Sequence, residues 1–410
     1  MIRSMYSAIS GLRNHQTMMD VVGNNIANVN TTGYKGSNTV FHDVLSQTLQ
    51  GATGPATLGG TNPAQVGLGS RLAGINTDFS QGSLQRSGRI TDMAIQGDGF
   101  FVVDQGGAQV FSRAGNFSLD ANGNLATTEG GLVQGWQADG FGNIDSNGAI
   151  GPLKVPVGQL VPPTGTANIN LDGNLPAADA VGTAVTTASK IYDTQGNAVI
   201  LNFTFTKTAA NQWTATASYG SPATNVALTN NVLAFDATGT LTSGASMGIA
   251  AGAIPQMTAM SVNMGGTGTT GQVSQYGSAN SLLARTQDGA SAGSLQSFSM
   301  GQDGTIMGTY TNGQTRAIAQ VALANFANPQ GLEKIGNSQF RITANSGAPE
   351  IGVAGLGGKG LLVQGALEQS NVDLAQEFTS LIMAQRGFQA NGRVITTSDE
   401  MLQEVVNLKR

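Results

Sequence analysis

The sequence contains no cysteine and unusually little charge. Only 10% of its 410 residues are Asp, Glu, Lys or Arg, whereas a typical soluble domain has about 25%. Without cysteine no disulfide can form, which fits a reducing compartment or a route that threads the unfolded chain through a narrow channel. Between Thr208 and Ala284 the only charged residue is Asp236. That surface must consist of small polar residues, and a net charge of -5 allows copies to pack closely.

Residues for catalysis or metal binding are scarce. The only two histidines, His15 and His42, lack metal-ligand spacing, and without cysteine few nucleophile-base pairs can form. The segment after Asp120 resembles a calcium loop only until Leu125 and Gly131, which replace the required Gly and Glu. We therefore predict no enzyme, no cofactor and no metal. A glycosidase-like carboxylate pair is the enzymatic alternative, although no pattern selects its residues.

The charge pattern also argues against nucleic acid and membrane partners. Basic residues are scattered, and Lys409 and Arg410 form their only adjacent pair. No apolar run is long enough to span a bilayer, so membrane insertion is not expected. The first residues lack the apolar run and cleavage site of a secretory signal peptide. By this criterion alone the protein is predicted to be cytoplasmic.

Apolar residues recur at a spacing of seven near both ends of the chain. A strict seven-residue repeat keeps one apolar stripe facing a partner along a whole helix, as in coiled coils. We therefore predict a terminal seam for subunit assembly, with two flanking residues included. Its members are Met5, Ile9, Leu12, Met19, Ile26, Leu367, Leu374, Phe378, Leu381, Phe388, Ile395 and Leu402. The alternative is two ordinary amphipathic helices that pack on a globular core.

The helices would be marginal on their own. Burying about ten seam residues does not offset the conformational entropy lost when some seventy residues become ordered. We predict that both ends are largely disordered in the free monomer and fold when neighbouring copies bury their remaining faces.

The middle of the chain favours β-structure. Turns of the form D-x-x-G-N recur at Asp120, Asp139 and Asp193, and Asp236 repeats the first four positions. The predicted fold is multidomain α+β, with terminal helices paired as a coiled-coil-like core and two mainly antiparallel β domains nested between them. The expected parts are a helical core at 1–30 and 367–410, a connecting segment at 31–70, an inner β domain at 71–145 and 285–360, and an inserted outer β domain at 146–284.

Several segments resemble the bacterial flagellar rod and hook protein family. The residues NNIANVNTTGYK at 24–35 resemble its N-terminal signature, whose matching positions are Asn24, Asn25, Asn28, Thr32, Gly33 and Tyr34. Residues 370–403 resemble its closing helix, and residues 95–103 and 324–340 resemble parts of its flanking β domain. Residues 192–207, YDTQGNAVILNFTFTK, resemble the outer domain of hook members, which a distal rod member normally lacks.

This resemblance implies a structural role. Members of the family form helical polymers whose terminal helices build an inner tube and whose β domains build outer layers. A hook subunit would self-assemble into a curved, flexible tube, the universal joint that transmits torque from motor and rod to filament. The implied partners are further copies, the distal rod protein, the hook cap protein, the hook-filament junction protein and the flagellar type III export apparatus. The implied location is the extracellular hook, reached without a cleaved signal peptide. The alternatives are a distal rod subunit and, more remotely, a secreted β-rich adhesin or glycan-active protein.

Overall fold

The computed structural model describes residues 2–52, 54, 60–140, 142–158, 160–265 and 272–407. The chain forms two compact units, and it crosses between them four times. Unit 1 comprises residues 1–155, 298–307 and 316–410, and unit 2 comprises residues 156–297 and 308–315. The main segment of unit 2, residues 156–297, therefore begins and ends about ten residues or more after the predicted insert at 146–284. Within this insert, residues 266–271 lie outside the described residues.

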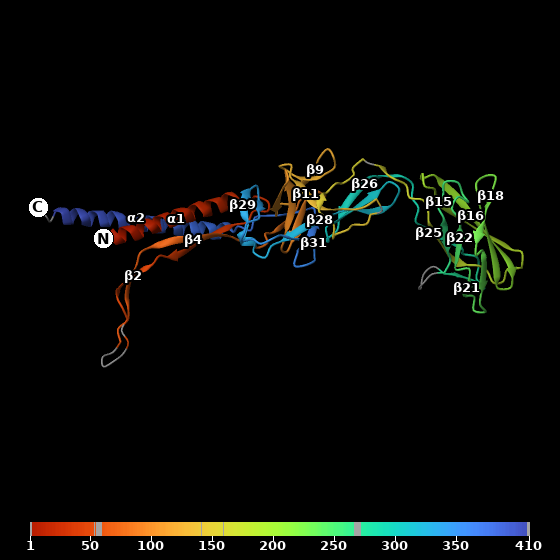
Figure 1. The fold of residues 1–410 in the computed structure, drawn as a ribbon, viewed down its shortest axis with the longest axis horizontal. Coiled ribbons are helices and arrows are strands. Elements are labelled where there is room, and N and C mark those ends of the chain that lie inside the picture. The colour runs from red at the N-terminus through yellow and green to blue at the C-terminus, as the bar shows by residue number, and fades with distance from the viewer. Residues whose placement is uncertain are drawn as a thin grey trace. The chain divides into compact units, whose positions relative to one another are not determined.

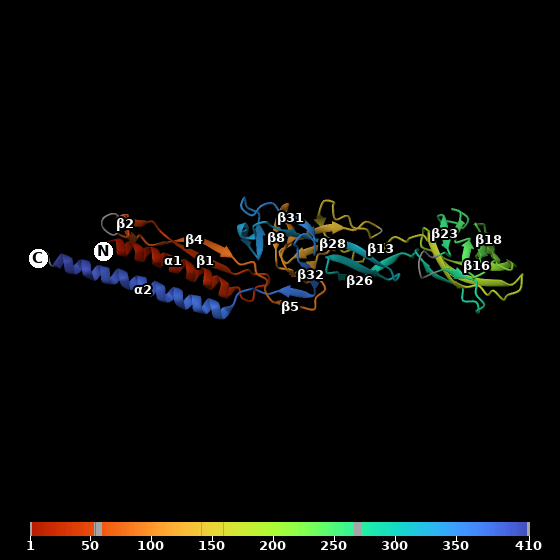
Figure 2. The same cartoon turned by 90° about the horizontal axis from the view of Figure 1, so that it is seen from below.

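Unit 1 contains both long helices. Helix α1 spans Ile2–Ala27 and helix α2 spans Leu374–Asn407; they lie side by side and run antiparallel (Figures 1 and 2). The predicted first helix is confirmed. The predicted position of Leu367 in the C-terminal helix is wrong, because this residue pairs with Gln85 between two short strands. Helix α2 begins seven residues after Leu367, at Leu374. Asp373 caps its first turn by accepting a hydrogen bond from the Ala375 N–H at 2.8 Å.

The β part of unit 1 is built around one large sheet. Within the unit its order is β28-β11-β7-β8-β30-β29, and an aromatic cluster that includes Phe100, Phe111 and Phe340 packs on it. The strands of unit 1 are β1 Ser37–Asp43, β2 Ser46–Gln50, β3 Ala64–Gly67, β4 Ser70–Thr77, β5 Leu84–Arg86, β6 Met93–Gln96, β7 Phe100–Gln105, β8 Ala108–Ser112, β9 Phe117–Leu119, β10 Leu125–Thr127, β11 Leu132–Gln137, β12 Gly151–Pro152, β28 Thr315–Asn325, β29 Glu333–Gly336, β30 Gln339–Arg341, β31 Glu350–Val353, β32 Leu361–Gln364 and β33 Ala366–Glu368. A 3-10 turn, η1, spans Pro329–Gly331. Strands β26 Gly293–Met300 and β27 Thr305–Tyr310 are divided between the units.

The segment between α1 and the sheet is more ordered than the sequence predicts. Strand β1 pairs with β4 and strand β2 pairs with β3, both antiparallel. The predicted connecting segment at 31–70 therefore contains regular strands, including β3 at residues 64–67; residues 53 and 55–59 lie outside the described part. All residues of β2 and β3 are exposed, so this ribbon has no apolar core within the described chain.

Unit 2 is a β domain with a large apolar core. Its strands are β13 Leu160–Val161, β14 Asn168–Asn174, β15 Ala184–Tyr192, β16 Ala198–Ala209, β17 Gln212–Tyr219, β18 Thr224–Val226, β19 Leu228–Thr229, β20 Val232–Phe235, β21 Leu241–Ser243, β22 Ser246–Ile249, β23 Met260–Asn263, β24 Val273–Ser274 and β25 Leu283–Gln287. Strands β14 to β25 form two six-stranded sheets, one of which has the order β15-β16-β17-β20-β21 with β18 paired to β17, whereas β13 pairs with β26. The alternation along β16 predicts Leu201, Phe203 and Phe205 on one face, and all three are fully buried. Trp213 on β17 is buried in the same cluster.

The repeated Asp motifs form turns closed by their own side chains. The Asp193 carboxylate accepts hydrogen bonds from the Gln195 N–H, the Asn197 N–H and the Asn197 side chain at 2.8–2.9 Å. The same contacts surround Asp120, and these donors hold the pKa of both carboxyls below the usual range, the amide of the following Asn having the largest effect. The Asp193 turn places Gly196 at a φ of +85°, which favours glycine. The expectation of turns at these motifs is confirmed.

Candidate assembly site: the helix pair and its junction

One line of α2 that faces α1 is made of small or polar residues. Its members, seven residues apart, are Glu377, Ala384, Asn391 and Ser398. Ala384 and Ser398 are buried, and the other two are half-buried. The parallel line of larger apolar residues, Leu381, Phe388, Ile395 and Leu402, is half-buried throughout. The seven-residue spacing is present, but only one of the two lines is apolar.

Small residues let the two helices approach closely. A Cβ atom on Gly387 would lie 2.5 Å from the ring of His15, and one on Gly11 would lie 2.8 Å from the side-chain nitrogen of Asn391. Moving along α1 from Gly11 to His15, the contacted position on α2 moves back from Asn391 to Gly387. This is the order that an antiparallel pair requires. A larger residue at Gly387 would force the His15 ring to move, and one at Gly11 would force the end of the Asn391 side chain to move.

The predicted seam residues of α1 are not its most buried ones. Met5, Ile9, Leu12, Met19 and Ile26 are all half-buried, whereas the buried residues of this helix are Ala8, Asn14, Val22 and Asn25.

Another face of α1 is covered by the β1–β4 hairpin. Asn14 donates to the Ser70 hydroxyl at 2.8 Å, and the Ser70 N–H donates to Ser10 at 3.2 Å. On α2, Leu374 and Phe378 are 40% and 51% exposed. A single chain thus leaves much of the predicted seam open to solvent.

Asn25 joins α1 to the start of α2. Its side-chain nitrogen donates to the Ser37 carbonyl at 2.8 Å and to Glu377 at 2.9 Å, and its oxygen accepts from the Ser37 N–H at 3.0 Å. Asn25 is 1% exposed, so replacing it would remove three hydrogen bonds to the half-buried Ser37 and Glu377. Partial burial raises the pKa of Glu377, and the hydrogen bond from Asn25 acts against this shift.

The remaining signature residues build the turn that follows α1. Asn28 donates to the Asn24 carbonyl at 2.9 Å, and the Tyr34 hydroxyl donates to the Asn24 side chain at 2.7 Å. The Thr32 carbonyl accepts a hydrogen bond from Ser338 at 3.2 Å. Gly33 has a φ of +67°, and a Cβ atom there would lie 2.6 Å from the Ala114 nitrogen. The structure brings all six signature residues together as a connection between α1 and the β sheet.

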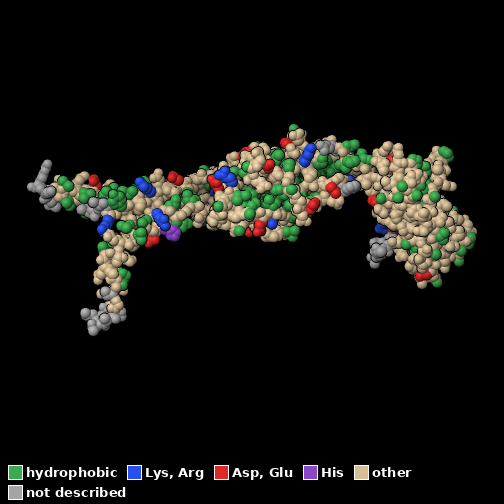
Figure 3. Space-filling view, in the orientation of Figure 1, with side chains coloured by type: hydrophobic (Ala, Val, Ile, Leu, Met, Phe, Trp, Pro, Cys, Tyr) green, Lys and Arg blue, Asp and Glu red, His purple; other side chains and the backbone are tan. Residues whose placement is uncertain are grey.

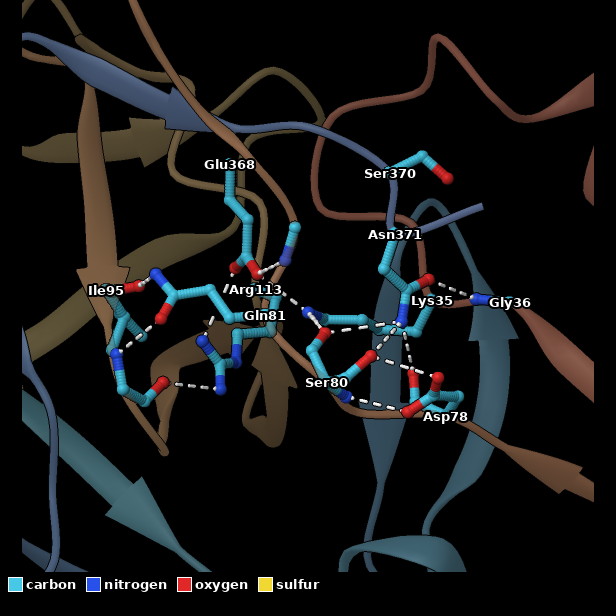
Figure 4. Close-up of polar contacts among 12 residues, drawn as sticks. Lys35, Gly36, Asp78, Ser80, Gln81, Ile95, Arg113, Glu368, Ser370 and Asn371 are labelled. Carbon is cyan, nitrogen blue, oxygen red and sulfur yellow. Dashed lines mark hydrogen bonds and ion pairs between the residues drawn. The ribbon is translucent and has the colours of Figure 1, made fainter. Parts of the chain in front are cut away.

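A buried ion cluster lies beneath this turn (Figure 4). The Glu368 carboxylate accepts from Lys35 Nζ at 2.7 Å, from Arg113 Nη1 at 3.3 Å and from the Gly82 N–H at 2.9 Å. The Lys35 and Glu368 side chains have no exposed surface, and that of Arg113 is 2% exposed. Burial lowers the pKa of both Lys35 and Arg113, while Glu368 acts in the opposite direction.

The cluster connects distant parts of the chain. Lys35 follows the signature turn, Arg113 follows β8, and Glu368 ends β33 just before α2. Asn371 adds a second connection, accepting from the Gly36 N–H at 2.9 Å and donating to the Asp78 carbonyl at 2.9 Å. Sequence reasoning did not select Arg113 or Glu368. The available signal was their presence as charged residues in a chain that has few of them.

The features of this site define a class of protein. Among the residues that the structure describes, no group of His, Asp or Glu could hold a metal ion, and no described helix is long and apolar enough to cross a membrane. The site consists of a buried, hydrogen-bonded junction next to two helices that have exposed apolar side chains. Such an arrangement is typical of a structural subunit that associates through its helices.

Comparison with known proteins places the chain in a particular family. Residues 5–35 match the model "Flagella basal body rod protein", residues 94–177 "Flagellar hook protein FlgE/F/G D1 domain", residues 164–290 "Flagellar basal body protein FlaE D2 domain" and residues 363–408 "Flagellar basal body rod FlgEFG protein C-terminal". The chain belongs to the flagellar hook and basal-body rod protein family.

Several relatives are similar over the full chain. The flagellar hook protein FlgE of Borreliella burgdorferi is 39% identical over 100% of both chains, and that of Escherichia coli is 35% identical over 98% of this chain and 99% of its own. The flagellar basal-body rod protein FlgG of Bacillus subtilis is 33% identical over 100% of both chains. The crystal structure of Helicobacter pylori flagellar hook protein FlgE2 shares the fold, with a TM-score of 0.54 and 16% identity, and covers 70% of this chain and 100% of its own.

Proposed function

We propose that the chain is the structural subunit of a bacterial flagellar hook, not an enzyme. Copies assemble into a curved, flexible tube that transmits torque from rod to filament. The observation that carries this proposal is the 39% identity to a hook protein over the entire length of both chains. The aligned region includes the helices, the junction and unit 2.

The helix pair is the proposed core of the polymer. The apolar residues of each helix recur every seven residues, and most of them are only half-buried in one chain. This is the arrangement expected if other copies complete a coiled-coil-like seam. Contacts between such copies are heterologous, so they generate an open helical polymer. The ends become fully ordered only when copies meet, because one chain buries too little of their apolar surface.

Bending is assigned to the outer unit. The face of unit 2 in Figure 3 is mostly uncharged, in agreement with the single Asp236 between Thr208 and Ala284. Contacts between such surfaces have few ion pairs to hold one register, so they can change as the tube bends. The helical core keeps its contacts and transmits the torque.

The proposed location and partners follow from membership of the family. Subunits leave the cell unfolded through the flagellar type III export apparatus without a cleaved signal peptide. In the finished structure they contact the distal rod protein, the hook cap protein and the hook-filament junction protein. A chain without cysteine cannot form disulfides that would obstruct such a route.

A distal rod subunit is the second candidate. The 33% identity to a rod protein over the full length of both chains favours it specifically. The two candidates differ in where the polymer forms and whether it is curved.

Complementation separates the two functions. The chain would be expressed in cells that lack their own hook protein and, separately, in cells that lack their distal rod protein. We expect curved hooks on electron micrographs of the first strain only. Leu381→Asp should abolish these hooks, because a buried carboxylate in the seam would be unpaired, whereas the exposed substitution Arg393→Lys should leave them intact. Rescue of the rod-deficient strain alone would reverse the assignment.

A further inference from the structure

Helix α2 exposes two separate apolar stripes besides the line that faces α1. The first stripe is Leu374, Phe378 and Ile382, which are 40–51% exposed. The second stripe is Met383, Val394, Met401 and Val405, which are 40–56% exposed. Exposed apolar side chains grouped in this way mark contact surfaces.

The two stripes lie on opposite sides of the helix. With 3.6 residues per turn, the first stripe is centred about 120° to one side of Ala384 and the second about 85° to the other side. Ala384 is buried against α1, so α1 covers the side of α2 between the two stripes that contains Ala384. On the side of α2 that faces away from α1, the stripes are separated by exposed polar residues such as Arg386, Arg393 and Glu400.

The stripes are also centred at different positions along the helix. The first spans residues 374–382 and the second spans residues 383–405; Phe378 and Val394, which lie near their centres, are about 24 Å apart along the axis at 1.5 Å per residue. A single neighbouring copy therefore cannot contact both stripes at once. Each stripe must contact a different neighbour.

We propose that the first stripe of each copy packs against the second stripe of a laterally adjacent copy, displaced along the helix axis by about 24 Å. This inference rests on the proposed function and specifies the partner surface. The partner is a second copy because both stripes belong to the same chain, are continuous with the helix-pair seam, and carry no charge that would select a different protein. Because the two stripes differ, the contact is heterologous and repeats around a tube.

The absence of cysteine makes a direct test possible. A double variant with Phe378→Cys and Val394→Cys cannot form an intrachain disulfide, because its Cα atoms are about 24 Å apart and a disulfide needs about 4.4–6.8 Å. After mild oxidation of assembled tubes, we expect a ladder of covalent multimers on a non-reducing gel. The matched control carries Phe378→Cys with Arg393→Cys, whose second thiol is on the polar face, and should give no ladder.

Single variants provide a second readout. Maleimide labelling of Phe378→Cys and of Val394→Cys should be at least about tenfold slower in tubes than in monomers, while Arg393→Cys should change far less. Should the double variant fail to form tubes on electron micrographs, the single variants decide the question.

The outcomes are distinguishable from failure of the proposed function. Tubes without a ladder, equal ladders from test and control, or unprotected thiols in both stripes would overturn the inference and leave the hook assignment intact. Failure of the unsubstituted chain to form tubes in hook-deficient cells would count against the proposed function itself.

Discussion

Unit 2 buries its large apolar side chains, whereas the helix pair leaves many of its own exposed. In unit 2, large residues such as Trp213, Phe203 and Leu201 are completely buried within one chain. In the helix pair, Phe378 and Met401 are about half exposed, while Ser398 and Asn25 are buried. Burial within one chain is sufficient to stabilise unit 2, whereas the proposed assembly requires the helices to gain much of their stability from contacts with other copies.

Hydrogen exchange should show the largest effect of this difference. In the monomer, we expect amides of α1 and α2 to exchange nearly as fast as in an unfolded chain, and amides of β16 to be protected. In assembled tubes the helices should become protected by several orders of magnitude, because neighbours bury them. Mass spectrometry of both forms measures this, and strong protection of α2 in the monomer would remove the contrast.

The junction should be the most sensitive point of unit 1. Glu368→Gln leaves the buried Lys35 and Arg113 without their carboxylate, so we expect a loss of about 3–5 kcal/mol in the free energy of unfolding. Glu333→Gln is the control, since the Glu333–Arg341 pair is exposed on both sides and is expected to contribute about 0–1 kcal/mol. Denaturant unfolding measures both. Equal effects would mean that the buried cluster is not special.

A matched pair of leucines compares the two regions directly. Leu201→Ala in unit 2 removes a fully buried side chain and should cost about 2–5 kcal/mol of stability. Leu374→Ala removes an exposed one and should change monomer stability by no more than about 0.5 kcal/mol. The order should reverse for assembly, with Leu374→Ala slowing tube growth more than Leu201→Ala under conditions where both variants are folded. Light scattering follows the growth.

Two glycines of α2 test the close approach of the helices. Gly387→Ala would place a methyl group against His15 and should destabilise assembled tubes by about 1–3 kcal/mol per subunit. A Cβ atom on Gly392 would meet no neighbouring atom of the described chain within 4 Å, so Gly392→Ala should instead raise helix stability by about 0.5–1 kcal/mol. The dissociation temperature of tubes measures both, and a tolerated Gly387→Ala would contradict the close packing.

The smallest expected effect concerns pH. Because the folded pKa of Glu377 is raised, the protonated form favours folding; its contribution is present below the unfolded pKa and is lost as pH rises through the folded pKa. Tubes should therefore become slightly less stable as pH rises from about 4 towards neutrality. Glu377→Gln keeps the hydrogen bond from Asn25 and should flatten this dependence. An unchanged profile in the variant would assign the effect to another group.

Local patterns account for what could be predicted. Alternation along β16 places Leu201, Phe203 and Phe205 in the core, and the Asp turns form where their motif occurs, since both depend on residues close in sequence. The predicted C-terminal helix extends too far back, to Leu367, because the seven-residue spacing continues by coincidence into β33. Spacing alone could not reveal that the helix begins at Leu374, after the capping residue Asp373.

The two terminal helices, the β-rich middle, the low charge between Thr208 and Ala284 and the family resemblance can all be read from the residues alone. The folded chain is needed to see which line of each helix faces the other, and that Glu368 pairs with Lys35 across 333 residues of chain. Periodicity and turn chemistry act over only a few residues. Close approach at Gly387 and burial of an ion cluster depend on which distant segments the fold brings together.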